Sequence, residues 1–326
     1  MTMPPSRVRR FGGPEALVAE AIRPALRHLV VSGLLLFPSQ LPACADVRAI
    51  ADQLRSLGAQ VTESGGAVSK VVFRDCSKLG DAEFRAIGRL TKLKSLTLYG
   101  KCAGLTDATL PHLAGLKELE ELGTDGIQVT DDGLKHLAAL TSLQRASFFH
   151  ISFGMKGFTG AGFAHLKPLA KLERLTVAGT PFNDTGMAAV AQLTQLREFS
   201  TWHTYQTEAG NAELKKLPNI RSLRLGQRLR QYGPNAKNDL SLTDETLATL
   251  AGIKTLETLS LDEVRLTHAG LAQLKSLPSL KKLTLQRADI PAADIEKLRA
   301  DLPRVAIEWK PLTDEERKGL ENILKR

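Results

Sequence analysis

The pattern L-x-x-L-x-L, in which x is any residue, recurs along most of the chain. Leu93–Leu98 is a representative copy, with leucines at its first, fourth and sixth positions. Alternating apolar residues of this kind are typical of a β-strand with one buried face. The copies begin at positions 68, 93, 119, 143, 172, 196, 220, 256 and 280, most of them 24 to 26 residues apart. A repeat of this length predicts a solenoid, in which each unit stacks on its neighbours.

Each copy is followed by a second segment with helical spacing. In Val129–Leu140, Thr130 precedes two acids, and apolar residues then recur at intervals of three. A threonine hydroxyl can accept hydrogen bonds from the free amides of a first helical turn, and acids stabilise the positive end of the helix dipole. Similar segments begin at Leu105, Phe182, Leu242 and Leu266. The unit is therefore predicted to be strand, turn, capped helix and turn, with parallel strands in one layer and helices in the other.

The combined pattern, L-T-D-x-x-L followed by leucines at three-residue steps and then L-x-L, resembles the leucine-rich-repeat (LRR) family over positions 68–305. It is similar to the repeats of exported bacterial proteins and of F-box proteins, although no F-box precedes it here. The resemblance implies an α/β fold, a curved solenoid of about nine repeats with a parallel sheet on the concave face and helices on the convex face. It also implies that macromolecules bind to the concave sheet, usually without catalysis.

Residues 1–45 have a different pattern and are predicted to be a signal peptide. Five arginines precede or flank the start of a nine-residue apolar run, Leu29–Phe37, and the small residues Ala43, Cys44 and Ala45 follow it. A basic stretch, a short apolar segment and an A-x-A site are typical of secretory signals, and the apolar run is too short to span a bilayer. We expect cleavage after Ala45 and export to the periplasm, the cell envelope or the medium. The alternatives are a buried helix, a wrongly assigned start, or a lipoprotein with Cys44 at its N-terminus.

The charge of the chain falls when this segment is removed. The formal net charge is +9, and residues 1–45 hold five arginines and two glutamates, or +3, so residues 46–326 carry +6. Nucleic-acid binding would need a continuous basic stripe. The residues expected on the concave face carry charges of both signs, which argues against a nucleic-acid partner. The 43% of hydrophobic and 24% of charged residues are typical of a folded globular protein.

The two ends of the repeat array are predicted to be caps, because terminal repeats would otherwise expose apolar edges. Residues 46–67 have the pattern of a helix and a strand. Residues 306–326 have the pattern of an edge strand and a last helix, opened by a capping box at Thr313 and Glu316. Two repeats are longer than the others, around 151–158 and 226–239. Such insertions map to loops on one rim, which either bind a partner or are neutral.

Side chains between the strand leucines should point away from the core and form three columns on the concave face. The most promising patch joins Phe149, Trp202 and Arg224, with His203 nearby. Aromatic residues and arginine are enriched in the hot spots of protein interfaces. The candidate partner-binding residues are Tyr99, Phe149, Trp202, Tyr205, Arg224, Arg228 and Arg230. Alternatively, the aromatic side chains only cover their neighbours, or they stack on a glycan.

We expect no cofactor, no metal and no catalytic residue. His112, His136 and His165 occupy the same slot in successive helices. Neighbouring helices pack about 8–10 Å apart, whereas zinc needs all its ligands about 2 Å from one ion. The sequence has no H-E-x-x-H, G-x-S-x-G or G-x-x-x-x-G-K motif. An enzyme is therefore the least favoured class.

Two cysteines, Cys76 and Cys102, stand at equivalent places in adjacent repeats. Neighbouring strands lie about 4.8 Å apart, within the range for a disulfide, and export would place the protein in an oxidising compartment. The spacing therefore predicts a Cys76–Cys102 disulfide. The alternative is a pair of small buried thiols.

Together these features predict an exported, monomeric, non-catalytic LRR protein that binds a protein partner through its concave sheet and rim loops. The alternatives are a cell-envelope module that binds a glycan or a peptide and, least favoured, an enzyme built on the solenoid.

Overall fold

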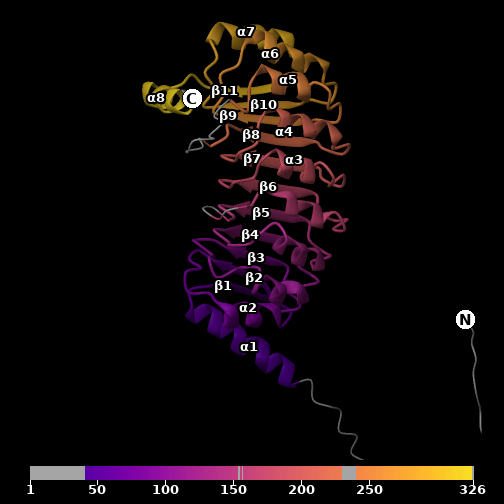
Figure 1. The fold of residues 1–326 in the computed structure, drawn as a ribbon, viewed down its shortest axis with the longest axis vertical. Helices are drawn as coiled ribbons and strands as arrows, with labels where there is room; N and C mark the ends of the chain where they lie inside the picture. Colours follow the sequence, from indigo (N-terminus) through magenta and orange to yellow (C-terminus); the bar gives the residue numbers. More distant parts are fainter. Residues whose placement is uncertain (1–40, 153–154, 156, 230–239, 325–326) are drawn as a thin grey trace, which may run out of the picture. The chain divides into compact units, whose positions relative to one another are not determined.

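The repeats form one continuous sheet in the computed structural model, which describes residues 41–152, 155, 157–229 and 240–324. All described residues belong to one compact unit. In this unit eleven strands follow one another in chain order (Figure 1). The first strand is antiparallel to the second, and all later neighbours are parallel. The predicted LRR solenoid architecture is thus confirmed.

The parallel strands coincide with the repeated L-x-x-L-x-L segments, because alternate apolar residues of each segment face the core. The strands are β1 (Gln60–Ser64), β2 (Ala67–Phe73), β3 (Ser95–Leu98), β4 (Glu121–Asp125), β5 (Arg145–Phe149), β6 (Arg174–Ala178), β7 (Glu198–Trp202), β8 (Ser222–Gly226), β9 (Thr258–Asp262), β10 (Lys282–Gln286) and β11 (Ala306–Trp309). In β5, for example, Ala146 and Phe148 are fully buried, while Arg145, Ser147 and Phe149 on the other face are partly exposed. We call this second face, away from the helices, the open face.

The register of the strands is constant from repeat to repeat. Arg145 lies opposite Glu121 on one side and Arg174 on the other, and Phe149 likewise lies between Asp125 and Ala178. The predicted columns of side chains on the open face are therefore confirmed. Constant register matters for function, because it places residues that are about 24 positions apart in the sequence side by side.

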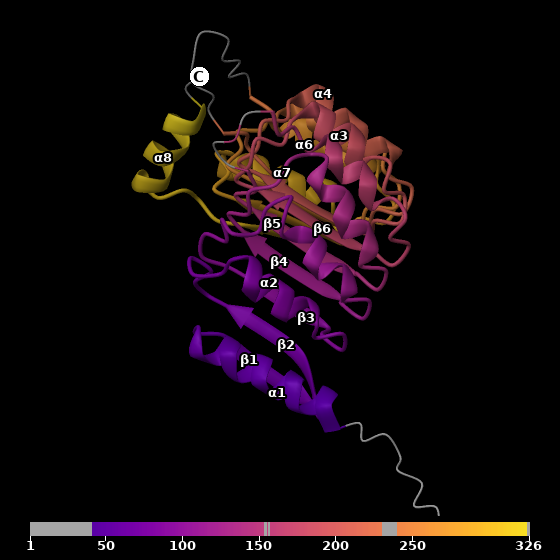
Figure 2. The same ribbon diagram turned by 60° about the horizontal axis from the view of Figure 1, so that its bottom comes forward.

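Helical segments cover the other face of the sheet (Figures 1 and 2). The α-helices are α1 (Leu41–Ser56), α2 (Asp81–Gly88), α3 (Asp184–Val190), α4 (Glu208–Ala212), α5 (Asp244–Leu250), α6 (His268–Ala272), α7 (Ala292–Asp301) and α8 (Asp314–Leu324). The 3-10 helices are η1 (Leu110–Gly115), η2 (Gly133–Ala139), η3 (Ala161–Leu166), η4 (Glu213–Lys216) and η5 (Gln273–Ser276). Within the described residues, no helix is both long enough and apolar enough to cross a membrane.

The helix predicted for each repeat is an α-helix in the first repeat (α2) and again from α3 onward, and a 3-10 helix in the three repeats between them. Helices α3 to α6 each begin after a residue whose side-chain oxygen accepts a backbone hydrogen bond, namely Asn183, Thr207, Thr243 and Thr267. The segments that begin at Leu105 and Val129 form the 3-10 helices η1 and η2. The predicted cap is present in the second of them, since the Gly133 N–H donates to the Thr130 hydroxyl at 3.1 Å.

Side-chain hydrogen bonds join successive repeats at the N-terminal ends of the helical segments. Asp184 accepts bonds from the backbone N–H and the hydroxyl of Thr207 at 2.6 and 2.7 Å. Asp244 accepts bonds from the same two groups of Thr267 at 3.1 and 2.5 Å. The other steps are Asp107 with Thr130, Asp131 with Thr159 and Glu208 with Thr243. This Thr–Asp ladder gives the acids of the T-D pattern a role beyond the helix dipole, because each acid also joins its repeat to the next.

A glycine three residues after the threonine makes room for this ladder. A Cβ atom on Gly133 would lie 1.7 Å from Oδ1 of Asp107, and one on Gly270 would lie 2.1 Å from Oδ1 of Asp244. Both distances are far below van der Waals contact. The glycine of the T-x-x-G pattern is therefore required by the carboxylate of the preceding repeat.

Both ends of the array have the elements predicted for caps. Helix α1 and strand β1 precede the first repeat strand, and strand β11 and helix α8 follow the last repeat. The predicted capping box is confirmed, since the Thr313 N–H donates to Glu316 and the Glu316 N–H donates to the Thr313 hydroxyl. Helix α1 already begins at Leu41, so the predicted cleavage after Ala45 would fall inside this helix. Cleavage there stays a prediction.

Helix α8 lies away from the row of repeat helices (Figures 1 and 2). Ion pairs hold it to the loops after β9 and β10: Arg317 binds Asp289 at 2.8 Å, and Arg265 binds Glu321. Of its described side chains, only Leu320 is buried. This helix therefore borders the open face near the C-terminal end of the array.

Candidate partner-binding site

Three aromatic side chains form a row on the open face. Tyr99 follows β3, Phe149 ends β5 and Trp202 ends β7, so an aromatic ring stands on every second strand. The ring centroids of Tyr99 and Phe149 are 6.0 Å apart, and those of Phe149 and Trp202 are 6.1 Å apart. The rings meet at interplanar angles of 85° and 57°. We call Tyr99, Phe149 and Trp202 the aromatic row.

Small residues next to the aromatic side chains leave room for this contact. A Cβ atom on Gly123 would lie 3.3 Å from the Tyr99 hydroxyl, and one on Gly226 would lie 2.6 Å from Cβ of Trp202. Ala178 lies between Phe149 and Trp202 and is buried beneath them. Tyr99 is 40% exposed, the highest value for a large apolar side chain among the described residues. The row therefore offers a continuous, partly exposed apolar surface across five strands, β3 to β7.

Arg224 of β8 continues the row at its C-terminal end. Its guanidinium carbon lies 4.6 Å from the centre of the Trp202 ring, a cation–π contact. Its Nη2 atom lies 3.5 Å from both Oδ2 of Asp262 and Oε1 of Gln286, which are long contacts. Among the described residues, no hydrogen-bond acceptor is within reach of its Nε or Nη1. Arg224 is thus held mainly by stacking, and its side chain is 42% exposed.

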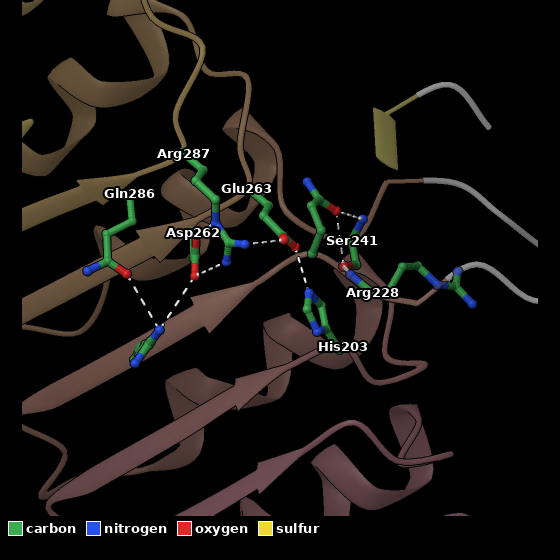
Figure 3. Close-up of polar contacts among 9 residues, drawn as sticks. His203, Arg228, Ser241, Asp262, Glu263, Gln286 and Arg287 are labelled. Carbon is green, nitrogen blue, oxygen red and sulfur yellow. Dashed lines mark hydrogen bonds and ion pairs between the residues drawn. The ribbon is translucent and has the colours of Figure 1, made fainter. Parts of the chain in front are cut away.

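Asp262, which Arg224 contacts, and the adjacent Glu263 are both buried. Figure 3 shows the two acids with their partners. The side chains of Asp262 and Glu263 are only 3% and 4% exposed. Arg287 binds both oxygens of Asp262, at 2.9 and 2.7 Å, and also Oε1 of Glu263 at 3.0 Å. Hydrogen bonding to Asp262 raises the pKa of Arg287 above its ordinary value. We call Asp262, Glu263 and Arg287 the acid–arginine cluster.

His203 reaches this cluster from β7. Its Nε2 atom lies 2.8 Å from Oε2 of Glu263, although the two residues are 60 positions apart (Figure 3). His203, Glu263 and Arg287 all have left-handed backbones, with φ of 51°, 59° and 45°. A left-handed backbone costs a non-glycine residue about 1 kcal/mol, and such strain tends to occur at functional sites.

Glycine fills the corresponding place after several other strands. Gly100, Gly126 and Gly179 stand directly after the third column and also have positive φ, of 75°, 72° and 62°. The chain therefore places charged or titratable side chains at positions where glycine would avoid the strain. Their hydrogen bonds to one another offset this cost.

Two cavities open on the same face. The larger, about 640 Å³, lies beside Arg224 and the acid–arginine cluster and is also lined by Trp309 of β11 and Glu316 of α8. The smaller, about 250 Å³, lies at the other end of the aromatic row, beside Tyr99. The aromatic row thus connects two hollows of the open face.

The charges of the first column are largely paired across strands. Arg145 donates to Glu121 at 2.8 Å, and Arg174 lies 2.7 Å from Glu198. The hydrogen bonds lower the pKa of Glu121 and raise that of Arg174. Because each of these two arginines faces an acid, they do not form a basic stripe of the kind that follows a phosphate backbone.

The structure does not bring all predicted site residues together. Tyr99, Phe149, Trp202 and Arg224 lie in contact along the open face. Tyr205 lies in the loop after β7, where its N–H donates to the Phe182 carbonyl, and it makes no ring contact with the row. Arg230 lies outside the described residues.

Arg228 differs from the exposed rim residue expected from the sequence. It is 2% exposed, and its N–H donates to the Ser241 hydroxyl at 3.0 Å (Figure 3). The reason is that the long repeat folds back on itself: the side chain of Gln227 bonds to both Ser241 and Leu242. Arg228 therefore does not offer its charge on an open rim.

Cys76 and Cys102 lie next to each other as buried thiols. Hydrogen bonding with Cys102, together with burial, raises the pKa of Cys76. The predicted disulfide stays a prediction, and the two side chains are placed where it could form.

The histidines of successive helices are separate from this site. His112 hydrogen-bonds to Asp81 at 2.7 Å. In the part of the chain that the structure describes, no three His, Cys, Asp or Glu side chains are grouped so as to hold a metal ion.

Sequence reasoning missed Glu263 and Arg287 as members of the site. Both stand one position after the third column, where Gly100, Gly126 and Gly179 mark the usual residue. Charged residues in a place that favours glycine are the signal that could have identified them.

No family model matches this sequence, and no curated protein matches it. Among solved structures, an internalin C2 from Listeria monocytogenes is similar, with a TM-score of 0.46 and 17% identity over 83% of this chain and 93% of that chain. An internalin F from the same species has a TM-score of 0.29 and 16% identity over 86% of this chain and 100% of that chain. An LRR protein of Leptospira interrogans has a TM-score of 0.32 and 14% identity, covering 69% and 80% of the two chains.

Proposed function

We propose that this protein is a non-catalytic interaction protein that binds a protein partner on the open face of its sheet. The aromatic row, continued by Arg224, is the observation that carries the proposal. Aromatic side chains and arginine dominate the hot spots of protein interfaces, where they fill desolvated pockets. Here they form one contiguous surface between two cavities, although they come from four different repeats.

Binding fits the acid–arginine cluster better than catalysis does. A catalytic carboxylate has to reach the substrate, within about 3 Å of the proton that it transfers. Asp262 and Glu263 are almost fully buried, and their oxygens are held by Arg287 and His203. The cluster therefore supports Arg224 and the floor of the cavity beside it.

The aromatic row is better suited to a protein partner than to a glycan. A sugar ring stacks on an exposed aromatic face. In the row, Tyr99 and Phe149 meet edge to face, and only Tyr99 is more than a third exposed. A protein partner can instead insert side chains between and above such rings.

The proposal can be tested by capture and titration. Proteins of the cell envelope are captured on the purified chain, each recovered protein is purified, and its affinity is measured by biolayer interferometry. We expect Trp202→Ala to weaken binding at least tenfold, as for a hot-spot residue, whereas Arg299→Ala on helix α7 should leave it unchanged. Equal affinity for wild type and Trp202→Ala would contradict the proposal. Retention on cell-wall polysaccharide, lost in Trp202→Ala, would support the glycan alternative instead.

Export belongs to the same proposal. It is supported by the basic stretch, the short apolar run and the small residues before position 46. The intact mass of the protein recovered from the native envelope should correspond to a chain that begins at Asp46. Such a chain keeps the ion pair of Asp46 with Arg89, which joins α1 to the end of α2. A cytoplasmic protein that retains residues 1–45 would contradict export.

A further inference from the structure

The spacing of the aromatic row matches the geometry of an extended peptide. In an extended chain, side chains on one side are two residues apart, or about 6.6 Å. The ring centroids of Tyr99, Phe149 and Trp202 follow one another at 6.0 and 6.1 Å. An extended segment that runs across the strands would therefore place every second side chain over the next ring.

The end of the row favours a carboxylate. Arg224 follows Trp202, and its only hydrogen-bond contacts with described residues are two of 3.5 Å from one nitrogen. Its planar guanidinium is fixed by the Trp202 ring, which lowers the entropy lost when it binds a ligand. Charge-assisted, paired hydrogen bonds to a carboxylate are the strongest that this group makes.

The neighbouring arginine shows why Arg224 is the anchor. Arg287 already donates two hydrogen bonds of 2.9 and 2.7 Å to Asp262 and forms an ion pair of 3.0 Å with Glu263. These contacts compensate most of the buried negative charge, so that Asp262 competes only weakly for Arg224. The cavity of about 640 Å³ beside Arg224 has room for the group that binds there.

We propose that the open face binds an extended peptide segment with apolar side chains at alternate positions and a carboxylate two residues beyond the last of them. The apolar side chains lie on Tyr99, Phe149 and Trp202, and the carboxylate binds Arg224. Four such positions at two-residue steps correspond to a segment of about seven residues. This inference rests on the proposed function and specifies the chemistry of the partner.

Synthetic peptides test the inference directly. The probe is fluorescein-labelled Leu-Ser-Leu-Ser-Leu-Ser-Glu with an amidated C-terminus, and binding is measured by fluorescence anisotropy. The first control has the same composition with the three leucines adjacent, and the second has Gln in place of Glu. A reversed sequence tests the opposite chain direction. A peptide that ends in Ser with a free C-terminus tests whether the carboxylate is that of the main chain.

We expect the alternating peptide, in one of its two directions, to bind at least tenfold more tightly than the adjacent-leucine peptide and the Gln peptide. Arg224→Gln should lower the affinity for the Glu peptide at least tenfold and leave the affinity for the Gln peptide unchanged, because only the Glu peptide uses the guanidinium. Arg299→Gln is the matched control and should change neither. The chain has two tryptophans, Trp202 in the row and Trp309 at the cavity, so binding should also change the intrinsic emission of the wild type.

Equal affinity for the alternating and adjacent-leucine peptides would overturn the extended geometry. Equal affinity for the Glu and Gln peptides would overturn the carboxylate, and this comparison needs no variant that has to fold. If a captured protein depends on Trp202 but no alternating peptide binds, this inference fails and the proposed function stands. If neither the captured proteins nor the peptides depend on Trp202 for binding, both this inference and the proposed function fail.

Discussion

Two regions of the molecule hold acids where neighbouring repeats meet, and they hold them differently. In the Thr–Asp ladder, each acid accepts bonds from a backbone N–H and a hydroxyl, and the arrangement recurs from repeat to repeat. In the acid–arginine cluster, Asp262 and Glu263 are paired with Arg287 and His203, and within the described residues the arrangement occurs once.

The difference separates what stabilises the solenoid from what distinguishes its surface. Neutral donors at every step can be repeated, because each new repeat brings its own threonine. The cluster draws on residues of three repeats, carries left-handed backbones and lies beside an open cavity. We therefore expect changes in the ladder to alter the free energy of unfolding, and changes near the cluster to alter binding more than stability.

The largest effect is expected at Asp131. It accepts four hydrogen bonds from the next repeat, from the N–H groups of Thr159, Gly160 and Gly162 and from the Thr159 hydroxyl, at 2.8 to 3.0 Å. Hydrogen bonds to a charged group contribute about 1.5–3 kcal/mol each and are not additive, so Asp131→Ala should lower the free energy of unfolding by about 3 kcal/mol. Chemical denaturation followed by circular dichroism measures the change.

The adjacent acid provides the control for this prediction. Asp132 is 74% exposed and pairs only with Lys135 on its own helical turn. Exposed pairs of this kind contribute little, so Asp132→Ala should leave the free energy of unfolding nearly unchanged. Equal effects at the two positions would mean that the ladder is not what joins the repeats.

A smaller loss is expected at Gly270. Replacing a helical glycine by alanine usually stabilises a helix by about 1 kcal/mol. In α6, the new Cβ atom would lie 2.1 Å from Oδ1 of Asp244, so that Asp244 has to move and weaken its bonds to Thr267. Gly270→Ala should therefore lower the free energy of unfolding by about 2 kcal/mol.

Gly319 in α8 is the matched control for Gly270, because nothing lies within 4 Å of its added Cβ atom. Gly319→Ala should leave stability unchanged or raise it slightly. A double-mutant cycle adds a second test: Gly270→Ala and Asp244→Ala break the same contact, so their effects should not add. Full additivity would show that the glycine and the ladder are independent.

The repeated half of this comparison follows from the sequence, and the other half does not. Strand positions and the contacts of Phe149, Trp202 and Arg224 follow from a fixed period, because constant register aligns equivalent residues. The aromatic row could thus be predicted as a patch, though its ring geometry depends on the small side chains of Gly123 and Ala178.

The acid–arginine cluster depends on distances that no period encodes. His203 reaches over the intervening repeat to Glu263, and Arg228 is buried because the long repeat turns back through Gln227. The 3-10 form of η1 and η2 also could not be predicted, because the same T-D letters precede 3-10 helices here and an α-helix at α5. In each case the local sequence is compatible with two conformations, and tertiary contacts decide between them.

Cys76 and Cys102 form a third contact between repeats, and this one is uncharged. Its contribution to the free energy of unfolding can be measured through its dependence on pH. The pKa of Cys76 is raised in the folded protein, whereas an unfolded thiol titrates near about 8.5. Above that pH the unfolded chain binds fewer protons than the folded one. The contribution of this thiol to the free energy of unfolding is therefore fully present below about pH 8.5 and is lost as the pH rises. The reduced protein should lose about 1.4 kcal/mol per pH unit through this group.

Denaturation of reduced and oxidised protein between pH 8 and pH 10 measures this slope. Cys76→Ala lacks the thiol and should not show this slope. A protein with the predicted disulfide has no free thiol at this position and should not show it either. If reduced wild type and Cys76→Ala show the same dependence on pH, the buried thiol is not coupled to folding. Mass spectrometry of the alkylated, unreduced protein shows which form is present.

The change in stability at Asp262 should be smaller than those at Asp131 and Gly270, although its side chain is more deeply buried than any acid of the ladder. Asp262→Asn removes one charge from the acid–arginine cluster, but Arg287 is 45% exposed, remains paired with Glu263 and can be hydrated. We therefore expect a loss of only about 1 kcal/mol in the free energy of unfolding.

The same variant frees Arg224 from a neighbouring negative charge, so the Glu-containing alternating peptide should bind several-fold more tightly, while the Gln peptide should not. Opposite signs for stability and binding would show that the cluster tunes the open face at a small cost to the fold. A loss as large as that of Asp131→Ala, with peptide affinity unchanged, would instead make the cluster one more structural contact between repeats.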